Sequence, residues 1–259
     1  MINLKATFSR FARPLRPRCD RPLQPEGRLC VVGDIHGRSD LLEAMLGRIE
    51  ADSEPRGGID RLVFLGDYID RGDASAEVLR RLFQLSEDWG DSVVCLAGNH
   101  ERLMLEFLDD PARAGRRWLR NGGLQTLASF GIGQLGETAR GTALSAARDA
   151  LRARLPAQME PWLRSLPLSF RSGNLCAVHA ALDPALPVSA QPDATLLWGC
   201  GAFRTVARDD DLWVIHGHSI VEAPQVRGAV ISVDTGAYAT GRLTAAAIGP
   251  EGEVRFLST

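Results

Sequence analysis

Three short apolar runs in the first hundred residues each end next to a glycine that opens a polar cluster. The runs are Arg28–Val32, Arg61–Leu65 and Ser92–Leu96. Apolar runs of this length, bounded by glycine, are typical of buried parallel strands. Each is followed by apolar residues at helical spacing, over Ser39–Glu50, Ser75–Leu85 and Glu101–Leu108, with Ser39 or Asp40 as the expected cap of the first helix. Strand, loop and helix repeated three times predict βαβ units around a parallel sheet, an α/β fold.

The rest of the chain has a different pattern. Residues Ala114–Leu166 are rich in Ala, Leu and Arg and are expected to form a helical cap inserted at about 114–166. Short strands are expected again over Leu175–Val178, Leu212–Ile215, Ala229–Val233, Leu243–Ile248 and Val254–Leu257. Little helix separates the last of these, so an antiparallel or mixed arrangement is predicted for them. We therefore expect one domain over residues 29–259, preceded by a leader over residues 1–28.

Charge distribution separates the leader from the body. The leader has a net charge of +5, and because the whole chain carries −2, the remaining residues carry −7. The leader is expected to be flexible and to lie along the body, with a nucleic-acid or phosphate-binding arm as the alternative. An acidic body argues against general nucleic-acid binding, and no apolar run is long enough to predict a membrane span. Five cysteines without a CxxC pair favour a reducing, cytoplasmic compartment.

Polar clusters follow all three early runs, at Gly33–Gly37, Gly66–Gly72 and Gly98–Glu101. The carboxyl ends of strands in an open α/β sheet are where ligands bind, so the clusters are expected to converge on one site. His179, His216 and His218 also follow apolar runs. Carboxylate, imidazole and amide without thiolate suit divalent Mn, Fe, Co or Zn. Each cluster alone has a structural alternative, such as a turn, a helix cap or a core histidine, and the prediction depends on their joint occurrence.

The ordered blocks GDIHG, GDYIDRG, GNHE, VHA and GHS resemble those of the metal-dependent phosphoprotein phosphatases, within the calcineurin-like metallophosphoesterase superfamily. The chain is most similar to the bacterial and phage serine/threonine phosphatases of that family. The resemblance runs from about Leu29 to Thr244 and includes the softer features Trp118–Gly123 and Val233–Arg242. It implies a central β-sandwich flanked by helices in α/β/β/α layers, and two divalent ions, with Mn expected and Fe, Zn or Co as alternatives.

The resemblance also implies roles for individual residues. The implied metal ligands are Asp34, His36, Asp67, Asn99, His179 and His218, with Asp67 bridging both ions. His100 would be the general acid, oriented by Asp70, and Arg71 would bind the phosphate oxygens. A water whose pKa is lowered from about 15.7 toward roughly 7 by the metals would attack phosphorus directly. No phosphoenzyme is expected.

Two positions depart from the family pattern. His216 is a further candidate ligand or a partner of the ligands, and His218 is preferred because it occupies the position of the GHS block. The family often has an arginine two residues after Trp198, where this chain has Cys200. Arg204 is the candidate substitute for substrate binding.

The expected activity is hydrolysis of phosphate monoesters, above all phosphoserine or phosphothreonine in proteins. The first alternative is hydrolysis of diadenosine tetraphosphate or another nucleotide on the same scaffold. That branch commonly has glutamine where this chain has His36, which favours the phosphatase. The second alternative, a phosphate-binding regulator without catalysis, rests only on Cys200. The expected partners are a phosphoprotein or a small phosphoester, and neither a nucleic acid nor a membrane.

Overall fold

The computed structural model describes residues 21–133 and 135–259, which form two five-stranded sheets. The first sheet has the order β10-β9-β1-β2-β3. Its strands are β1 (Leu29–Val32), β2 (Arg61–Phe64), β3 (Val93–Cys95), β9 (Thr244–Ile248) and β10 (Val254–Ser258). Strands β1, β2 and β3 are parallel, as predicted, and the two C-terminal strands pair antiparallel beside them.

The second sheet has the order β4-β5-β6-β8-β7. Its strands are β4 (Ser169–Ser172), β5 (Leu175–Val178), β6 (Trp213–His216), β7 (Gln225–Arg227) and β8 (Val230–Ser232). β5, β6 and β8 are parallel, whereas the edge strands β4 and β7 run antiparallel, so this sheet is mixed. β4 and β7 were not predicted, because they are short, partly exposed edge strands without a continuous apolar run.

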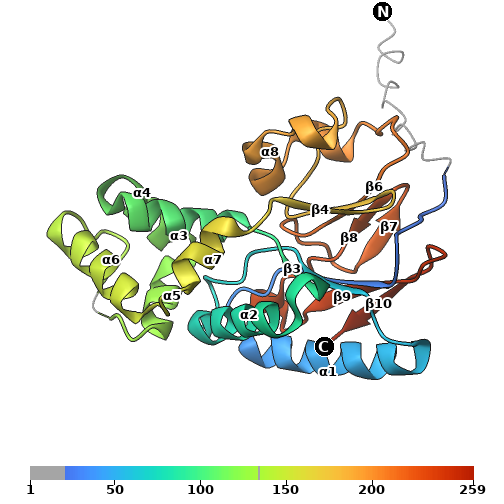
Figure 1. Cartoon of the computed structure of the whole chain (residues 1–259). Helices are drawn as coiled ribbons and strands as arrows, with labels where there is room; N and C mark the ends of the chain where they lie inside the picture. The colour runs from blue at the N-terminus through green and yellow to red at the C-terminus, as the bar shows by residue number, and fades with distance from the viewer. Residues whose placement is uncertain (1–20, 134) are drawn as a thin grey trace, which may run out of the picture.

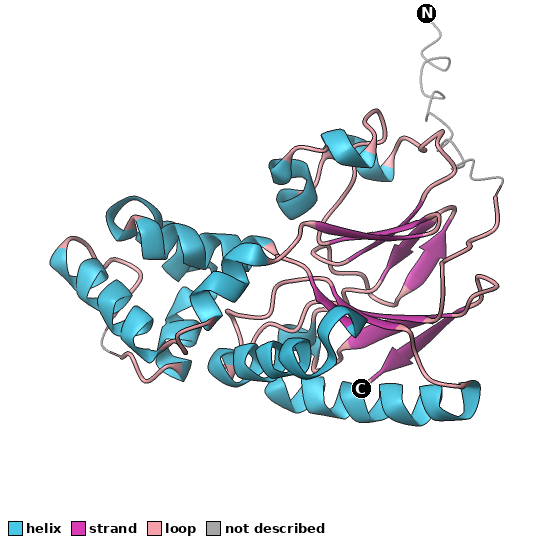
Figure 2. Cartoon of the chain, in the orientation of Figure 1, coloured by secondary structure: helices cyan, strands magenta, loops and turns pink. Residues whose placement is uncertain are grey.

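The two sheets face one another and helices cover the outer faces, in four layers α/β/β/α (Figures 1 and 2). Helices α1 (Ser39–Ser53) and α2 (Ser75–Trp89) pack on the first sheet, and α8 (Asp193–Trp198) lies over the second. A buried apolar cluster between the sheets joins Val31 and Val63 to Ile215 and Ile231. The layered α/β fold expected from the sequence is confirmed.

Helix α1 begins differently from the prediction. Its cap position is Arg38, without a side-chain cap bond, and neither Ser39 nor Asp40 caps it. The Asp40 carboxylate is instead bonded to the Arg38 guanidinium, at 2.6 and 2.8 Å, and this ion pair takes the oxygens that a cap would use.

Five helices and a π-helical segment lie beside the sheets between β3 and β4 (Figure 1). They are α3 (Asn99–Asp109), α4 (Pro111–Trp118), the π segment (Leu119–Gly123), α5 (Leu124–Ser129), α6 (Thr142–Arg154) and α7 (Met159–Ser165). Buried residues of α6 and α7 belong to the same apolar cluster as β1, β2, α1 and α2. Short helices complete the chain: η1 (Glu54–Arg56), η2 (Gly90–Ser92), η4 (Val188–Ala190), η5 (Gly201–Arg204) and α9 (Ala237–Thr240).

The predicted leader is described only from residue 21 onward. Leu23 is buried, and the Gln24 backbone N–H donates to Asn174 Oδ1 at 2.7 Å. Described residues ahead of the predicted boundary at residue 29 therefore already pack on the domain, and residues 1–20 lie outside the described part. No described helix is long and apolar enough to cross a membrane.

Candidate dinuclear metal centre

The predicted ligands come together from the ends of five strands in both sheets. Asp34 and His36 follow β1, and Asp67 follows β2. Asn99 and His100 lie in the first turn of α3, after β3, so this helix begins two residues earlier than predicted. From the second sheet, His179 follows β5 and His218 follows β6. The site therefore spans the edge of the sandwich where the carboxyl ends of these parallel strands meet.

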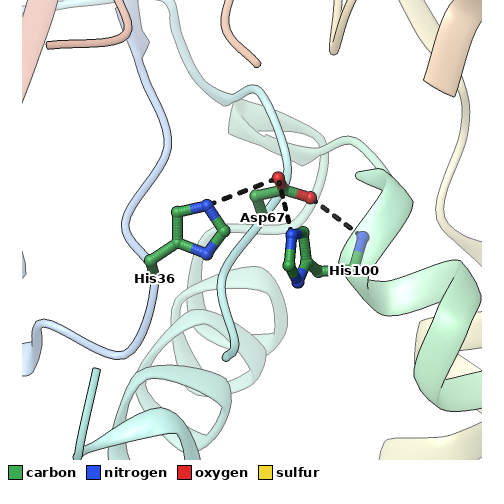
Figure 3. A group of neighbouring side chains, drawn as sticks. All are labelled: His36, Asp67 and His100. Atoms are coloured by element: carbon green, nitrogen blue, oxygen red, sulfur yellow. Dashed lines mark hydrogen bonds and ion pairs between the residues drawn. The ribbon is translucent and has the colours of Figure 1, made fainter. Parts of the chain in front are cut away.

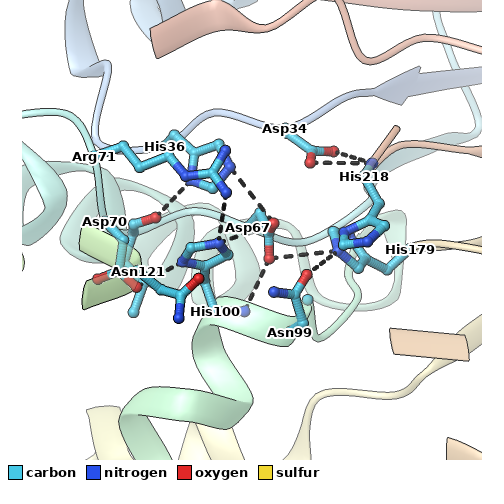
Figure 4. A network of polar contacts seen from close by, with 12 residues as sticks. Asp34, His36, Asp67, Asp70, Arg71, Asn99, His100, Asn121, His179 and His218 are labelled. Carbon is cyan, nitrogen blue, oxygen red and sulfur yellow. Dashed lines mark hydrogen bonds and ion pairs between the residues drawn. The ribbon is translucent and has the colours of Figure 1, made fainter. Parts of the chain in front are cut away.

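Two groups of potential metal ligands share the Asp67 carboxylate. In one group, Asp67 Oδ2 lies 3.5 Å from His36 Nε2 and 3.8 Å from His100 Nε2 (Figure 3). In the other, Asp67 Oδ1 lies 3.5 Å from His179 Nε2, with a nitrogen of His218 within reach (Figure 4). Each group holds its ligand atoms within 4.8 Å of one another. Asp67 thus offers one oxygen to each side, as a bridging ligand would.

Hydrogen bonds to the backbone fix two of the histidine rings. His36 Nδ1 lies 2.9 Å from the Ile69 carbonyl oxygen, and His179 Nδ1 lies 3.0 Å from that of Leu65. With the Nδ1 proton donated to a carbonyl, Nε2 presents its lone pair toward Asp67, which is how metal-binding histidines are usually oriented. Asn99 Oδ1 lies 2.9 Å from His179 Nε2, so two lone pairs face the same space, and this suits a cation.

The environment of these histidines favours the neutral form of the imidazole ring. Burial lowers the pKa of His36 to about 3 and that of His218 to about 4. Burial also lowers the pKa of His179. Neutral imidazole is the form that binds metal, so the environment favours the ligand state over the imidazolium.

Buried carboxylates give the site an excess of negative charge. Asp34, Asp67 and Asp234 are each at most 3% exposed. Burial, followed by the charges of Asp234 and Asp67, raises the pKa of Asp34 far above its usual range. Burial is also the main cause that raises the pKa of Asp234 to about 6. Buried carboxylates need a partner cation, and the donor set of carboxylate, imidazole and amide oxygen fits divalent metal ions.

His100 differs from the other histidines because a carboxylate holds its ring. Its Nδ1 lies 2.7 Å from Asp70 Oδ2, and both side chains are buried. Burial alone would lower the pKa of His100, but the charges of Asp67 and Asp70 outweigh it and raise the pKa. These two carboxylates therefore shift His100 toward the protonated form that a general acid needs, relative to a free histidine.

Side chains from α4 and α5 saturate the Asp70 carboxylate. Trp118 Nε1 donates to Asp70 at 3.0 and 3.1 Å, and Thr126 Oγ1 donates to it at 2.6 Å. Trp118 and Thr126 are fully buried. The Asp70–His100 pair is therefore held from the helical part of the chain, as well as from the loop after β2.

Arg71 extends over the same side of the site (Figure 4). Its Nη2 lies 3.3 Å from His100 Nε2, and its guanidinium carbon lies 4.6 Å from the centre of the Tyr238 ring. The Tyr238 ring in turn meets His36 edge to face, with centroids 5.2 Å apart. Arg71 is thus a cation beside the candidate ligands, held against an aromatic face.

Left-handed backbone is concentrated at this site. Six non-glycine residues of the described chain have positive φ: His36, Asp67, Asp70, Arg71, Asp211 and His218. All except Asp211 are predicted site residues. Such conformations cost roughly 1–3 kcal/mol each and gather at functional sites, where the surrounding structure enforces them.

Glu101 holds two of these loops together, a role that the sequence did not reveal. Its fully buried carboxylate accepts hydrogen bonds from the backbone N–H groups of Asp67, Tyr68 and Gly98, at 2.8–2.9 Å. Burial raises its pKa to about 7. Its place at the end of the GNHE block was the available sequence signal, but that place alone does not indicate which groups the carboxylate contacts. The sequence likewise assigned no individual role to Thr126, or to Trp118, Asp234 and Tyr238 within the softer family features.

The two departures from the family pattern are not members of the ligand groups. His216 is outside both groups, and its two ring nitrogens face Ser232 Oγ at 2.8 Å and the Gly217 carbonyl at 2.9 Å. Arg204 lines a cavity with His216 and Ser232. No hydrogen bond or ion pair between Arg204 and a predicted ligand is found among the described residues, and Cys200 is a free, partly buried thiol.

Comparison with known proteins identifies the family. A bis(5'-nucleosyl)-tetraphosphatase PrpE [asymmetrical] of Halalkalibacterium halodurans is 25% identical over 236 residues, covering 83% of this chain and 87% of its own length. Serine/threonine-protein phosphatase 2 of Escherichia coli is 41% identical over 93 residues, 36% of this chain and 37% of its own length. A crystal structure described as that of a candidate diadenosine tetraphosphatase superposes with a TM-score of 0.61 at 22% identity, over 90% of this chain and 94% of that one. Residues 27–222 match the family "Calcineurin-like phosphoesterase", and the chain belongs to that family.

Proposed function

We propose that the chain hydrolyses phosphoric esters with two divalent ions, Mn²⁺ being the first candidate. The proposed ligands are Asp34, His36, Asp67, Asn99, His179 and His218. The observation that carries this proposal is the pair of ligand groups that share the Asp67 carboxylate. The neutral histidines and the excess of buried carboxylate support it.

The chain's own residues supply the rest of the chemistry. When bound, the ions would activate a water and polarise the phosphoryl group. His100 faces the site through Nε2 and in its protonated form is placed to protonate the leaving oxygen, while Asp70 holds its Nδ1. Arg71 offers forked donors that match phosphate oxygens, and its contact with Tyr238 limits the directions in which they point.

We propose dinucleoside polyphosphates as the first substrate class, in place of the phosphoprotein that the sequence motifs favoured. The relative that aligns over more than four fifths of both chains bears the name of a bis(5'-nucleosyl)-tetraphosphatase. The serine/threonine phosphatase aligns over 93 residues only. A name shared over most of both lengths is the stronger argument, because that alignment extends through the helices between β3 and β4 into the second sheet.

Phosphoserine and phosphothreonine in proteins are the second substrate class. The 41% identity to a serine/threonine phosphatase and the imidazole of His36 in the first block support this alternative. Either class of substrate would be met in the reducing, cytoplasmic setting that the cysteine pattern of the sequence favours.

The test is a comparison of kcat/KM for diadenosine tetraphosphate and for a phosphoserine peptide, with Mn²⁺, Fe²⁺, Zn²⁺ and Mg²⁺ in turn. We expect the dinucleotide to be preferred at least tenfold. A preference for the peptide would move the assignment to a protein phosphatase. The Asp67→Asn variant should lose turnover of both, and unchanged turnover would overturn the proposed centre.

A phosphate-binding regulator without catalysis remains the alternative of a different class. It predicts fewer than two ions per chain by metal analysis and no turnover of p-nitrophenyl phosphate. We expect two ions and measurable turnover.

A further inference from the structure

A cavity of about 330 Å³ lies on the outer face of the second sheet, apart from the ligand groups. Its floor is made by β6 and β8, and its walls by η5 with the loop that follows it and by β7. Its volume is at the lower end of the range for small-molecule sites. None of the predicted metal ligands lines this cavity.

Apolar side chains make up much of the lining. Leu212 and Val214 are buried in the wall and floor, while Val206 and Ile220 are about half exposed, at 49% and 50%. Only five large hydrophobic side chains of the described residues are at least 38% exposed. Two of these five, Val206 and Ile220, line this cavity. Apolar surface left open in a concave place marks a ligand site more often than a convex surface does.

The charged residues of the lining leave a positive excess. Arg208 is paired with Asp210 and also donates to two backbone carbonyls, and Asp211 is paired with Arg21 at 2.9 Å. These partners neutralise one cation and one anion of the lining. Arg204 and Arg227 remain, and neither guanidinium has a hydrogen bond or an ion pair with another described residue.

Polar groups also lie at the floor of the cavity. His216 and Ser232 are buried, at 2% and 7% exposure, and bond to one another at 2.8 Å. The serine hydroxyl donates to His216 Nε2, because His216 Nδ1 faces the Gly217 carbonyl oxygen and therefore carries the ring proton. The cavity thus offers two guanidinium groups without a partner among the described residues, together with an apolar wall.

We propose that this cavity is a second ligand site, which takes a small organic phosphate carrying an apolar ring. Two forked guanidinium groups match phosphate oxygens in geometry and charge. The ring would pack on Val206, Val214 and Ile220. The site does not depend on the metal centre, so it stands whichever substrate class the chain hydrolyses.

The experiment is calorimetric titration of the metal-loaded protein with phenylphosphonate, whose carbon–phosphorus bond is not an ester and resists hydrolysis. We expect two equivalents to bind, one at the metal centre and one in the cavity. The double variant Arg204→Ala/Arg227→Ala should retain the first and bind the second at least about tenfold more weakly. Arg140→Ala/Arg154→Ala, which removes the same charge from the helical part of the chain, should keep both equivalents.

Other results would overturn the proposal. One equivalent in the wild-type protein would mean that the cavity is empty of such ligands. Two equivalents with unchanged affinities in the Arg204→Ala/Arg227→Ala variant would place the second site elsewhere. Methylphosphonate, which lacks the ring, should bind the cavity at least about fivefold more weakly than phenylphosphonate. Equal affinities of the cavity for the two phosphonates would mean that the proposed ligand needs no apolar ring.

Discussion

Asp70 is a carboxylate whose hydrogen-bonding capacity is almost fully used before any substrate arrives. Its two oxygens accept from His100, Trp118 and Thr126, and all four side chains are buried. A carboxylate held on three sides cannot turn away from the imidazole. Its role in orienting His100 thus depends on residues far away in the sequence.

Replacing Trp118 by phenylalanine should remove one of these three bonds while keeping an aromatic ring in the core. We expect kcat for an alkyl phosphate to fall about tenfold, because a hydrogen bond to a charged group is worth about 1.5–3 kcal/mol. For 2,4-dinitrophenyl phosphate, whose leaving group needs no proton, kcat should change less than about twofold.

The matched control is Trp162→Phe, since the Trp162 ring packs edge to face on Phe83 and takes no part in the hydrogen bonds to Asp70. It should leave both rates unchanged. An equal fall for both leaving groups in Trp118→Phe would contradict the orienting role and indicate a general loss of structure.

Residue types and their order were enough to predict which side chains converge here. The three early clusters lie directly after apolar runs, so their convergence follows from the parallel strands of the first sheet. The candidate ligand set, including His179 and His218 of the second sheet, came from the resemblance to the family. The hydrogen-bond partners could not be predicted in the same way. Trp118 and Glu101 act through bonds to Asp70 and to backbone N–H groups across loops, and nothing in the local pattern reveals such partners.

At the scale of elements, the segment Leu119–Gly123 between α4 and α5 contacts the loop that carries Asp70 and Arg71. The Arg71 backbone N–H approaches the Gly122 carbonyl at 3.4 Å, and Gly122 has a φ of 104°. A side chain at residue 122 would meet Arg71 N at 2.6 Å. Gly122 is not helical, so the chain kinks between α4 and α5, and the kink brings Trp118 and Arg71 into one neighbourhood.

Substituting Gly122 by alanine should displace the Asp70–Arg71 loop and also strain the backbone. We expect a loss of about 1–3 kcal/mol in the free energy of unfolding and a larger KM, because Arg71 loses its position. Urea unfolding and steady-state kinetics measure the two effects. Gly133→Ala is the control, since no atom lies within 4 Å of the added methyl and φ is not positive there; a similar loss in both variants would contradict the argument.

Helix α1 is tied to β10 by a partly buried ion pair between Asp52 and Arg255, at 2.8 Å for one of its two contacts. The hydrogen bond from Arg255 holds the pKa of Asp52 below its usual value. A lowered folded-state pKa stabilises the protein above the unfolded pKa, near 3.9, and the effect is lost as the pH falls through the folded value.

The Asp52→Asn variant should therefore be less stable than the wild type by about 0.5–1 kcal/mol at pH 7. The difference should stay constant down to about pH 5 and close below about pH 4. Urea unfolding at several pH values measures it, with Glu87→Gln, an exposed carboxylate, as the variant expected to show no difference. If the difference in the free energy of unfolding between the wild type and Asp52→Asn grew as the pH fell, the ionised Asp52 carboxylate would not have a stabilising role.

Two features of the structure could not be predicted from the local sequence pattern: the edge strands β4 and β7, and the residue at which α1 begins. β4 and β7 have too little apolar sequence to stand out, and their pairing with β5 and β8 is what makes them strands. Arg38 rather than Ser39 or Asp40 precedes α1, because Asp40 pairs with that arginine. In both cases contacts with other side chains or strands outweigh local propensity.

For the whole molecule, the candidate centre joins the two sheets across their shared edge. Asp34, Asp67 and Asn99 come from the first sheet, and His179 and His218 from the second. Ions bound there would contact both halves of the sandwich, so metal binding should stabilise the fold itself and not only the loops.

Removing the metal with a chelator should lower Tm by roughly 10 °C. Saturation at about a thousand times Kd is worth about 4 kcal/mol, and each kcal/mol shifts Tm by about 2–4 °C in a domain of this size. Calorimetry with and without Mn²⁺ measures the shift. The Asp67→Asn variant should show a much smaller one, and an unchanged wild-type Tm on chelation would contradict a centre that links the sheets.

The left-handed backbone at His36, Asp67, Asp70, Arg71 and His218 has a consequence for protein engineering. Glycine adopts such backbone without strain, so glycine at any of these positions should relieve local strain at the expense of chemistry. A library selected for heat resistance alone would accumulate replacements there and lose turnover in the same rounds. Those five codons should be held constant in any such library, and diversity introduced elsewhere.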